Sequence, residues 1–472
     1  MEFLCPSSPP QSILCTPPSL SGIKPPVTSK LTRTLTVSLA LACLGPPSLR
    51  ADEGPGISHE AKKLNQRGLG HLHDKRYDLA IASFREALRV HPEYPDALDN
   101  LGRSLDAAGK PAEAIAEFDR AIKIAPEKAA AYADKGMALF HEGKYEDAAA
   151  SYRQAIEHHM DFSEAQNGLG ASLLHLDKTD EAIAAFRSSV ASNPKNADAL
   201  GNLGSTLLRE NKVMEALPFL RRAKILRPDS QDVLEAYAVA LVQTGQPNEA
   251  IAAYHKLTSR HPDQPAFWAH LGDLYYKSKR YSQAASAFEK SLALKHDQPD
   301  VLLALGQAQA DQGKLGDAIQ SYEKTVALKP DQFDALYRLG AAYYQEKDYL
   351  KAADHYQKAY AQNPEFVGSL IGLSASQSAA NKFEDAAQTY RKLIPLKPDD
   401  ANLRFEFGNA LFNTGKYQEA AGSYREAVRL NPAFARAHYN LGMTLLRLDE
   451  SKTAQAELDE AHRLDPSLSP KK

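Results

Sequence analysis

Alanine recurs at every thirty-fourth residue over most of this 472-residue chain. The series runs without a gap through Ala80, Ala114, Ala148, Ala182, Ala216, Ala250, Ala284, Ala318, Ala352, Ala386, Ala420 and Ala454. Proline keeps the same register from Pro92 to Pro466 and is replaced only at Met160 and His296. Self-similarity at a fixed period of this length is typical of repeat proteins, in which each unit packs only against its neighbours.

Counting residue 61 as position 1 divides residues 61–468 into twelve repeats of 34 residues without an insertion. Position 8 is Gly in ten repeats, with Ala238 and Ser374 as the exceptions, and position 24 is Phe, Tyr or Leu in all twelve. Positions 1–14 and 16–30 both carry apolar residues at the i, i+3, i+4, i+7 spacing of an amphipathic helix. Each repeat is therefore predicted to form two helices.

Position 15 lies between the two predicted helices and is Gly, Asn, Asp or Lys in every repeat. Most of these residues tolerate the left-handed backbone that ends a helix. Small residues at positions 8 and 20 allow the two helices to approach closely, and the large residue at position 24 is expected to fill the space that they leave. Proline at position 32 stops the second helix.

The order of Leu-Gly, a later Ala, an aromatic residue four positions on and a final Pro is seen in Leu101, Gly102, Ala114, Phe118 and Pro126. This pattern closely resembles the tetratricopeptide repeat (TPR) family over all twelve repeats. The resemblance implies an all-α fold, a right-handed α-solenoid superhelix of tandem helix-turn-helix repeats. It identifies a fold and not a partner.

The residues before the repeats form a Pro-rich leader, residues 1–51. Residues 1–30 have no helical or strand period and are expected to be disordered. Residues 30–51 then contain basic residues followed by a short apolar stretch, which are the parts of a secretory signal peptide. The apolar stretch is about ten residues long, which is too short to span a bilayer. We expect export with cleavage within residues 42–51, then a flexible linker at residues 52–60. Residues 469–472 form a C-terminal tail.

Three alternatives for the leader stay open. The signal-like segment begins far from Met1, so translation could start at Val27 or Leu31, and an apolar patch without a targeting role would leave the protein cytoplasmic. Residues Leu39 to Cys43 loosely resemble a lipobox, although Leu39 lies one position too far from Cys43. Lipidation at Cys43 would tether the protein to a membrane. The leading prediction is an exported, periplasmic or envelope-associated protein.

Composition and motifs argue against catalysis. The chain has 56 Lys and Arg against 59 Asp and Glu, a net charge of −3, so a general nucleic-acid binder is not expected. All three cysteines lie within the first 43 residues, which leaves the repeats without a disulfide, a zinc-thiolate site or a catalytic thiol. Phosphate-binding, zinc-hydrolase, serine-hydrolase and EF-hand motifs are also missing from the sequence. We predict no catalytic residue, no cofactor and no metal.

In TPR proteins the first helices line the concave face, and positions 2, 5, 9 and 12 usually meet the ligand. At these positions repeats 1–6 are rich in acidic residues, whereas repeats 7–12 are rich in aromatic and aliphatic ones. The predicted protein-binding groove comprises Asp96, Asp99, Asp106 and Glu235 in the acidic half, and Tyr276, Leu303, Tyr337, Tyr344, Ile371, Phe405, Phe412 and Tyr439 in the aromatic half.

Alternatives exist for both halves of this groove. Rings at positions 5 and 12 could pack against neighbouring helices and thicken the core, and the acidic half could be a solvated face. Position 5 is never Lys, which argues against the clamp with which some TPR proteins hold a C-terminal carboxylate. Asn100, Asn202 and Asn440 resemble the backbone-gripping asparagines of a glycosyltransferase-associated superhelix, but only in three repeats that are not adjacent.

The predicted function is a non-catalytic scaffold that binds an extended or helical peptide segment of a partner protein in this groove. The alternatives are an envelope-assembly lipoprotein tethered through Cys43 and a regulatory solenoid associated with an enzyme. No nucleic-acid partner is expected, and membrane contact is expected only through a lipid anchor.

Overall fold

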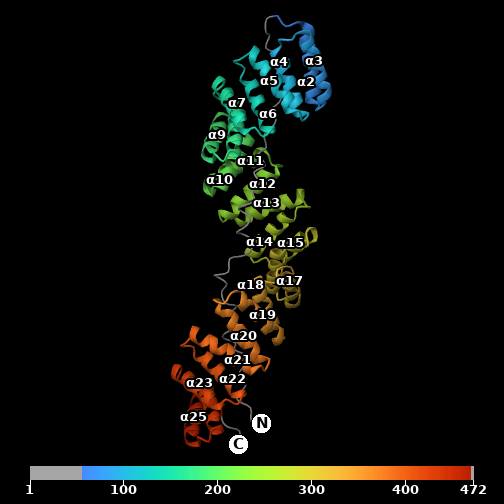
Figure 1. Cartoon of the computed structure of the whole chain (residues 1–472). Helices are drawn as coiled ribbons and strands as arrows, with labels where there is room; N and C mark the ends of the chain where they lie inside the picture. The colour runs from blue at the N-terminus through green and yellow to red at the C-terminus, as the bar shows by residue number, and fades with distance from the viewer. Residues whose placement is uncertain (1–55, 469–472) are drawn as a thin grey trace. The chain divides into compact units, whose positions relative to one another are not determined.

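The computed structural model describes residues 56–468, and within them the chain forms 24 α-helices and no strand (Figure 1). These residues divide at Pro262–Asp263 into two compact parts, the N-terminal block (residues 56–262) and the C-terminal block (residues 263–468). The predicted leader, Cys43, residues 52–55 of the linker and the tail lie outside the described residues, whereas the last two linker residues, His59 and Glu60, already belong to the first helix. No helix among residues 56–468 has an apolar stretch long enough to cross a membrane.

In the N-terminal block a first helix and a second helix alternate, one pair per repeat. The first helices are α2 (His59–His73), α4 (Pro95–Ala107), α6 (Ala129–His141), α8 (Ser163–His175), α10 (Ala197–Arg209) and α12 (Gln231–Gln243). The second helices are α3 (Tyr77–Val90), α5 (Pro111–Ile124), α7 (Tyr145–His158), α9 (Thr179–Ser192), α11 (Val213–Leu226) and α13 (Pro247–Arg260).

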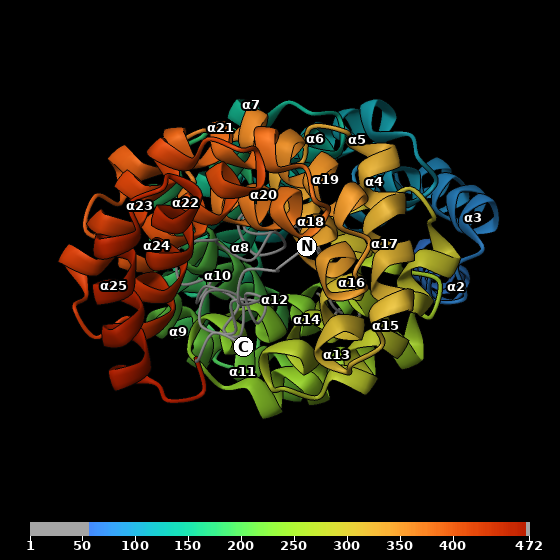
Figure 2. The same cartoon turned by 90° about the horizontal axis from the view of Figure 1, so that it is seen from below.

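The C-terminal block repeats this alternation. Its first helices are α14 (Pro265–Lys277), α16 (Pro299–Asp311), α18 (Phe333–Gln345), α20 (Val367–Ala379), α22 (Ala401–Asn413) and α24 (Ala435–Arg447). Its second helices are α15 (Tyr281–Leu294), α17 (Leu315–Leu328), α19 (Tyr349–Gln362), α21 (Phe383–Leu393, followed by the 3₁₀ turn Ile394–Leu396), α23 (Tyr417–Leu430) and α25 (Ser451–Leu464). Figure 2 shows neighbouring pairs such as α22 with α23 and α24 with α25, and the same pairs are in contact.

The turn inside each repeat places one residue in the left-handed region. Position 15 has a positive φ in all twelve repeats, and the values run from 56° at Asp177 to 77° at Gly109. The next residue closes the turn with a backbone hydrogen bond to position 11, as in Lys110 N to Leu105 O at 2.9 Å. This bond satisfies a carbonyl at the end of the first helix. The predicted role of position 15 as a helix terminator is confirmed.

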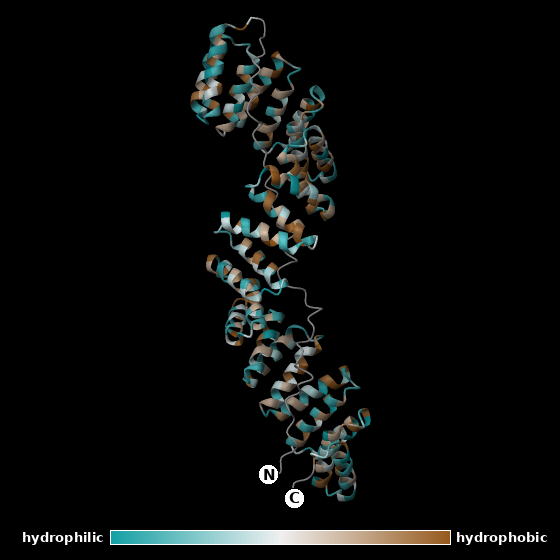
Figure 3. Ribbon diagram, turned by 180° about the vertical axis from the view of Figure 1, so that it is seen from behind, coloured by the Kyte–Doolittle hydropathy of each residue, from teal (hydrophilic) through white to brown (hydrophobic). Residues whose placement is uncertain are grey.

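The core of each repeat forms around the residue at position 24. A Cβ atom added to Gly102, at position 8, would lie 2.6 Å from the ring of Phe118, so the ring occupies the space of the missing side chain. Tyr152 fills two such spaces, at Gly136 in its own repeat and at Gly168 in the next repeat. The helices carry both hydrophobic and hydrophilic residues (Figure 3). The predicted all-α fold of tandem helix pairs is confirmed.

Candidate binding surface

Three residues predicted for the aromatic half of the groove lie in the core instead. Leu303, Tyr337 and Phe405 are 0%, 9% and 2% exposed. The ring of Tyr337 packs edge-on against Phe366, with a centroid distance of 5.1 Å, and that of Phe405 lies 4.8 Å from Phe434. Position 5 faces positions 24 and 34 of its own repeat, so a large side chain there is drawn inward. The expectation that these three residues meet a ligand is wrong, and the core alternative holds for them.

The rings at position 12 lie in a different environment. Tyr276, Tyr344 and Phe412 are half-buried. Each packs against a tyrosine at position 17, across the turn of its own repeat, and the centroid distances for Tyr276–Tyr281, Tyr344–Tyr349 and Phe412–Tyr417 are 5.5, 5.3 and 5.1 Å. Part of each position-12 ring stays exposed beside its partner. Ile371 and Tyr439, both at position 5, are also half-buried.

Tyr276 also connects two repeats. Its hydroxyl donates a hydrogen bond to Oδ2 of Asp311 at 2.7 Å, from position 12 of repeat 7 to position 13 of repeat 8. Burial, together with this hydrogen bond, raises the pKa of the Tyr276 phenol. The N-terminal block has the same connection between Asp106 and His141, where Nδ1 lies 3.0 Å from the carboxylate. The hydrogen bond that His141 makes to the Asp106 carboxylate raises the pKa of His141, which favours a charged pair.

Asp99 of the predicted acidic half is buried together with Asp134, and the two residues are 6% and 2% exposed. Lys128 Nζ lies 3.5 Å from Oδ2 of Asp99, and Arg103 Nε lies 3.9 Å from Oδ2 of Asp134. The Oδ1 atom of each carboxyl group has no hydrogen-bond partner. Burial raises the pKa of Asp99, and burial beside Asp99 raises that of Asp134 well above its ordinary value. Asp99 therefore belongs neither to a solvated face nor to a surface that a ligand can reach directly.

The other predicted acidic residues are half-buried. Asp96 accepts a hydrogen bond from Lys128 at 2.7 Å. Burial, with Asp232 nearby, raises the pKa of Glu235. Asp96 and Asp106 thus already have partners within the protein, whereas Glu235 keeps a partly exposed carboxyl group on α12.

Asparagines at positions 5 and 6 form hydrogen bonds between repeats that the sequence analysis did not foresee. Asn100 donates to Asn65 at 3.2 Å, and Asn202 donates to Asn167 at 3.0 Å. In each case position 6 of one repeat donates to position 5 of the preceding repeat. The offset of 35 residues was visible in the sequence as Asn at both sites. Asn440 donates instead to Asn409, at 2.8 Å. All three asparagines compared with a peptide-gripping superhelix are therefore engaged within the protein.

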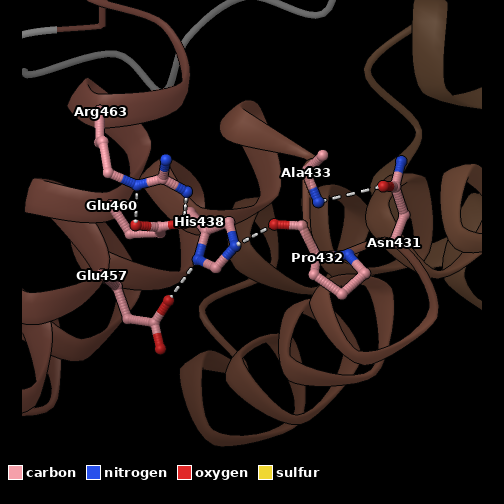
Figure 4. A network of polar contacts seen from close by, with 7 residues as sticks. All are labelled: Asn431, Pro432, Ala433, His438, Glu457, Glu460 and Arg463. Atoms are coloured by element: carbon pink, nitrogen blue, oxygen red, sulfur yellow. Dashed lines mark hydrogen bonds and ion pairs between the residues drawn. The ribbon is translucent and has the colours of Figure 1, made fainter.

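A buried histidine connects the last two helices of the C-terminal block. His438 of α24 is 7% exposed. Its Nδ1 lies 2.6 Å from Oε2 of Glu457 on α25, and its Nε2 lies 3.1 Å from the carbonyl oxygen of Pro432 (Figure 4). The carbonyl can only accept, so Nε2 donates to it. The imidazole therefore contacts an oxygen atom through each of its two nitrogens. Among residues 56–468 no three His, Cys, Asp or Glu side chains form a group that could hold a metal ion.

Models of known repeat families match most of the described chain. Tetratricopeptide repeat models match residues 66–129, 100–161, 133–192, 167–231, 207–274, 343–404, 408–449 and 435–468. A model described as the TPR domain of cytochrome c-type biogenesis protein H matches residues 255–366. No curated protein matches the chain.

Solved structures that are similar to parts of this chain include YrrB, described as a TPR protein with an unusual peptide-binding site. It is 24% identical over 39% of this chain and 94% of its own, with a TM-score of 0.35. The Cut9–Hcn1 structure of the APC/C is 15% identical over 86% of this chain and 94% of its own, with a TM-score of 0.31. Pseudomonas aeruginosa pilF is 22% identical over 44% of this chain and 96% of its own, with a TM-score of 0.37.

The repeat period, the left-handed turn in every repeat and the packing of position 24 against position 8 agree with the family models that match from residue 66 to residue 468. The chain belongs to the tetratricopeptide repeat family.

Proposed function

We propose that this protein is a non-catalytic scaffold that binds a segment of a partner protein along the first helices of its C-terminal block. The observation that carries the proposal is the set of half-exposed rings at position 12 of alternate repeats, Tyr276, Tyr344 and Phe412. Aromatic side chains supply much of the binding energy at protein interfaces because they are large and rigid. Each of these rings is held by its position-17 tyrosine, so little entropy is lost when a partner covers it.

The partner fitted by this surface is a peptide segment with apolar side chains. Ile371 and Tyr439, on α20 and α24, are half-buried and would extend the apolar surface on the first helices. Leu303, Tyr337 and Phe405 do not belong to this surface, since their burial leaves nothing for a partner to cover. In the N-terminal block, Glu235 remains a separate candidate for contact with a basic residue of a partner, since Asp96 and Asp106 are already paired with Lys128 and His141.

Site-specific photocrosslinking in the native host tests this surface. A photoreactive phenylalanine analogue in place of Tyr344 should crosslink to a discrete partner. The same analogue in place of Leu350, which is 61% exposed on the second helix of that repeat, serves as the matched control. The additional change Phe412→Ala should reduce the Tyr344 adduct about thirtyfold if the ring is a hot spot. Equal adducts at both sites, or none at residue 344, would contradict the proposal.

A second candidate, a role in assembly at the cell envelope, rests on two observations. The leader has the parts of a signal peptide, and the model that matches residues 255–366 is named for a cytochrome c-type biogenesis protein. We propose export on these grounds, with Cys43 as the candidate lipid attachment site. Mass spectrometry of the mature N-terminus tests cleavage within residues 42–51. Detergent partitioning of the wild type against Cys43→Ser separates a lipoprotein from a soluble exported scaffold, and an intact leader on a cytoplasmic protein would contradict both.

A further inference from the structure

The outer face of α11, in repeat 5, carries an apolar stripe that no part of the described chain covers. Met214 and Ile225 are 77% and 70% exposed. They are eleven residues apart, which places them on the same side of an α-helix about 16 Å apart along its axis. Pro218, also exposed, lies between them on that side. The stripe therefore extends over most of the helix.

Comparison between repeats shows that this stripe is peculiar to repeat 5. Position 29, where Ile225 lies, is Arg, Lys, Glu, Ala, Ser or Pro in the other eleven repeats. Position 18, where Met214 lies, has a large aliphatic side chain only once more, at Leu350. Packing of the repeat does not require either residue, because most of each side chain is exposed.

The stripe lies on a helix segment rich in basic residues, of which Arg227 is paired with Asp198. Residues 212–227 contain the basic residues Lys212, Arg221, Arg222, Lys224 and Arg227 and a single acidic residue, Glu215. This local excess contrasts with the net charge of −3 of the whole chain. By helix geometry Arg221 and Arg222 flank the stripe on opposite sides.

Both flanking arginines keep donors available. Arg222 donates to the carbonyl of Pro194 at 2.7 Å. The half-exposed side chain of Arg221 lies 4.0 Å from Glu249 and is hydrogen-bonded to Tyr237. A guanidinium has five donors, so these contacts saturate neither arginine. The only carboxylate on the helix, Glu215, forms an ion pair with Arg187 of the preceding second helix.

We infer that this face of α11 docks on an anionic lipid surface. Exposed apolar side chains between arginines are the arrangement with which interfacial helices enter the headgroup region, where the guanidinium groups bind lipid phosphates. Met214 and Ile225 project from a helix ridge, a geometry suited to insertion into a soft surface. The face lies on a second helix, separate from the first-helix surface of the proposed function, so either proposal can fail without the other.

Vesicle sedimentation of the full chain tests the inference. The background is Cys43→Ser, so that acylation contributes nothing. The protein should sediment with phosphatidylcholine vesicles that contain 30% phosphatidylglycerol, less so in high salt, and only weakly with pure phosphatidylcholine. Arg221→Gln and Arg222→Gln should each weaken binding about fivefold. Met214→Glu combined with Ile225→Glu should weaken it about tenfold or more, because it also brings carboxylates to the anionic surface.

A matched control uses the other exposed aliphatic residue at position 18. Leu350→Glu should leave binding unchanged, since Leu350 lies near Asp354 and has no flanking arginine pair. With all three native cysteines replaced by serine, a bimane label at residue 214 should shift to the blue on addition of anionic vesicles, whereas a label at residue 350 should not. Absence of the blue shift at residue 214, or equal binding to neutral vesicles, overturns the inference. Without the shift at residue 214, an acidic protein segment would be the alternative ligand of this face.

Discussion

Asp99 and Asp134 occupy positions 5 and 6 of consecutive repeats, the two positions at which Asn65 and Asn100 form a hydrogen bond of 3.2 Å one junction earlier. An amide at position 6 has a proton to donate, whereas a carboxylate has none. The Oδ1 atoms of Asp99 and Asp134 both lack a hydrogen-bond partner, whereas the two asparagines are bonded to each other. A proton shared by the pair would restore the hydrogen bond found at the asparagine junctions.

We predict that Asp134→Asn stabilises the N-terminal block at neutral pH. The folded-state pKa of Asp134 is raised, so the folded protein holds a proton that the unfolded chain releases, and stability falls as the pH rises above the unfolded value of about 4. The substitution supplies the donor and should raise the free energy of unfolding by about 1–3 kcal/mol at pH 7. The gain should shrink toward pH 4. Urea unfolding at several pH values measures both, and a loss of stability at pH 7 would show that the ion pair with Arg103 dominates.

We predict that His438→Leu loosens the C-terminal helix α25. The change leaves the carbonyl of Pro432 and the carboxylate of Glu457 without their shared donor, at a cost of about 2–4 kcal/mol. Amide hydrogen exchange should accelerate across residues 451–464 and less in α22. Lys452→Gln, at an exposed position of α25, is the control and should leave exchange nearly unchanged. Uniform acceleration over the whole block would contradict a local role.

We predict opposite consequences for two aromatic residues of repeat 11. Phe405→Ala removes a core ring and should cost about 3–5 kcal/mol of unfolding free energy. Phe412→Ala removes a partly exposed ring that packs edge-on against Tyr417 and should cost about 1 kcal/mol. Thermal unfolding of the two variants separates them. A small cost for Phe405→Ala would return this residue to the binding surface.

We predict that Lys347→Gly stabilises the protein. Lys347 has a φ of 63°, a left-handed conformation that costs a residue with a side chain about 1–2 kcal/mol. Glycine avoids this cost, but it also makes the unfolded chain more flexible, which offsets part of the stabilisation. The net gain should be about 0.5–1 kcal/mol. Gly313→Ala, at position 15 of the preceding repeat, should lower stability instead. Equal and small effects of the two changes would mean that the turn relaxes to accommodate either residue.

Features that recur in every repeat, such as the helix pairs and the turns, could be predicted from the sequence. Features that depend on contacts between particular side chains, such as the burial of position 5, could not. Position 15 could be assigned because the conformational preference of Gly, Asn and Asp is a local property, and it held even where Lys occupies the site. The direction of position 5 was not local. Whether Tyr337 faces outward depends on the rings of Tyr356 and Phe366 from later parts of the same repeat, and a pattern of apolar residues does not distinguish a core ring from an exposed one.

The exposure of the rings at position 12 could not be predicted from their position alone either. Tyr276, Tyr344 and Phe412 were selected by position, but their exposure is set by the tyrosines at position 17, which the sequence also contains in the same register. Comparison of the two positions would have revealed the pairs. The junctions of Asn65 with Asn100 and of Asn167 with Asn202 could likewise be found by an offset of 35 residues, one more than the period.

The contacts at positions 5 and 6 and at positions 12 and 13 give the seams between repeats different chemistries. Within the N-terminal block two seams are closed by amide–amide hydrogen bonds, and the seam between repeats 2 and 3 holds the buried carboxyl groups of Asp99 and Asp134 together with the Asp106–His141 pair. In the C-terminal block one seam is closed by a tyrosine and an aspartate. Nearest-neighbour coupling makes the strength of each seam matter separately. Pulled from its ends, such a chain would yield one seam at a time, and alkali would weaken the carboxyl seam before the amide ones.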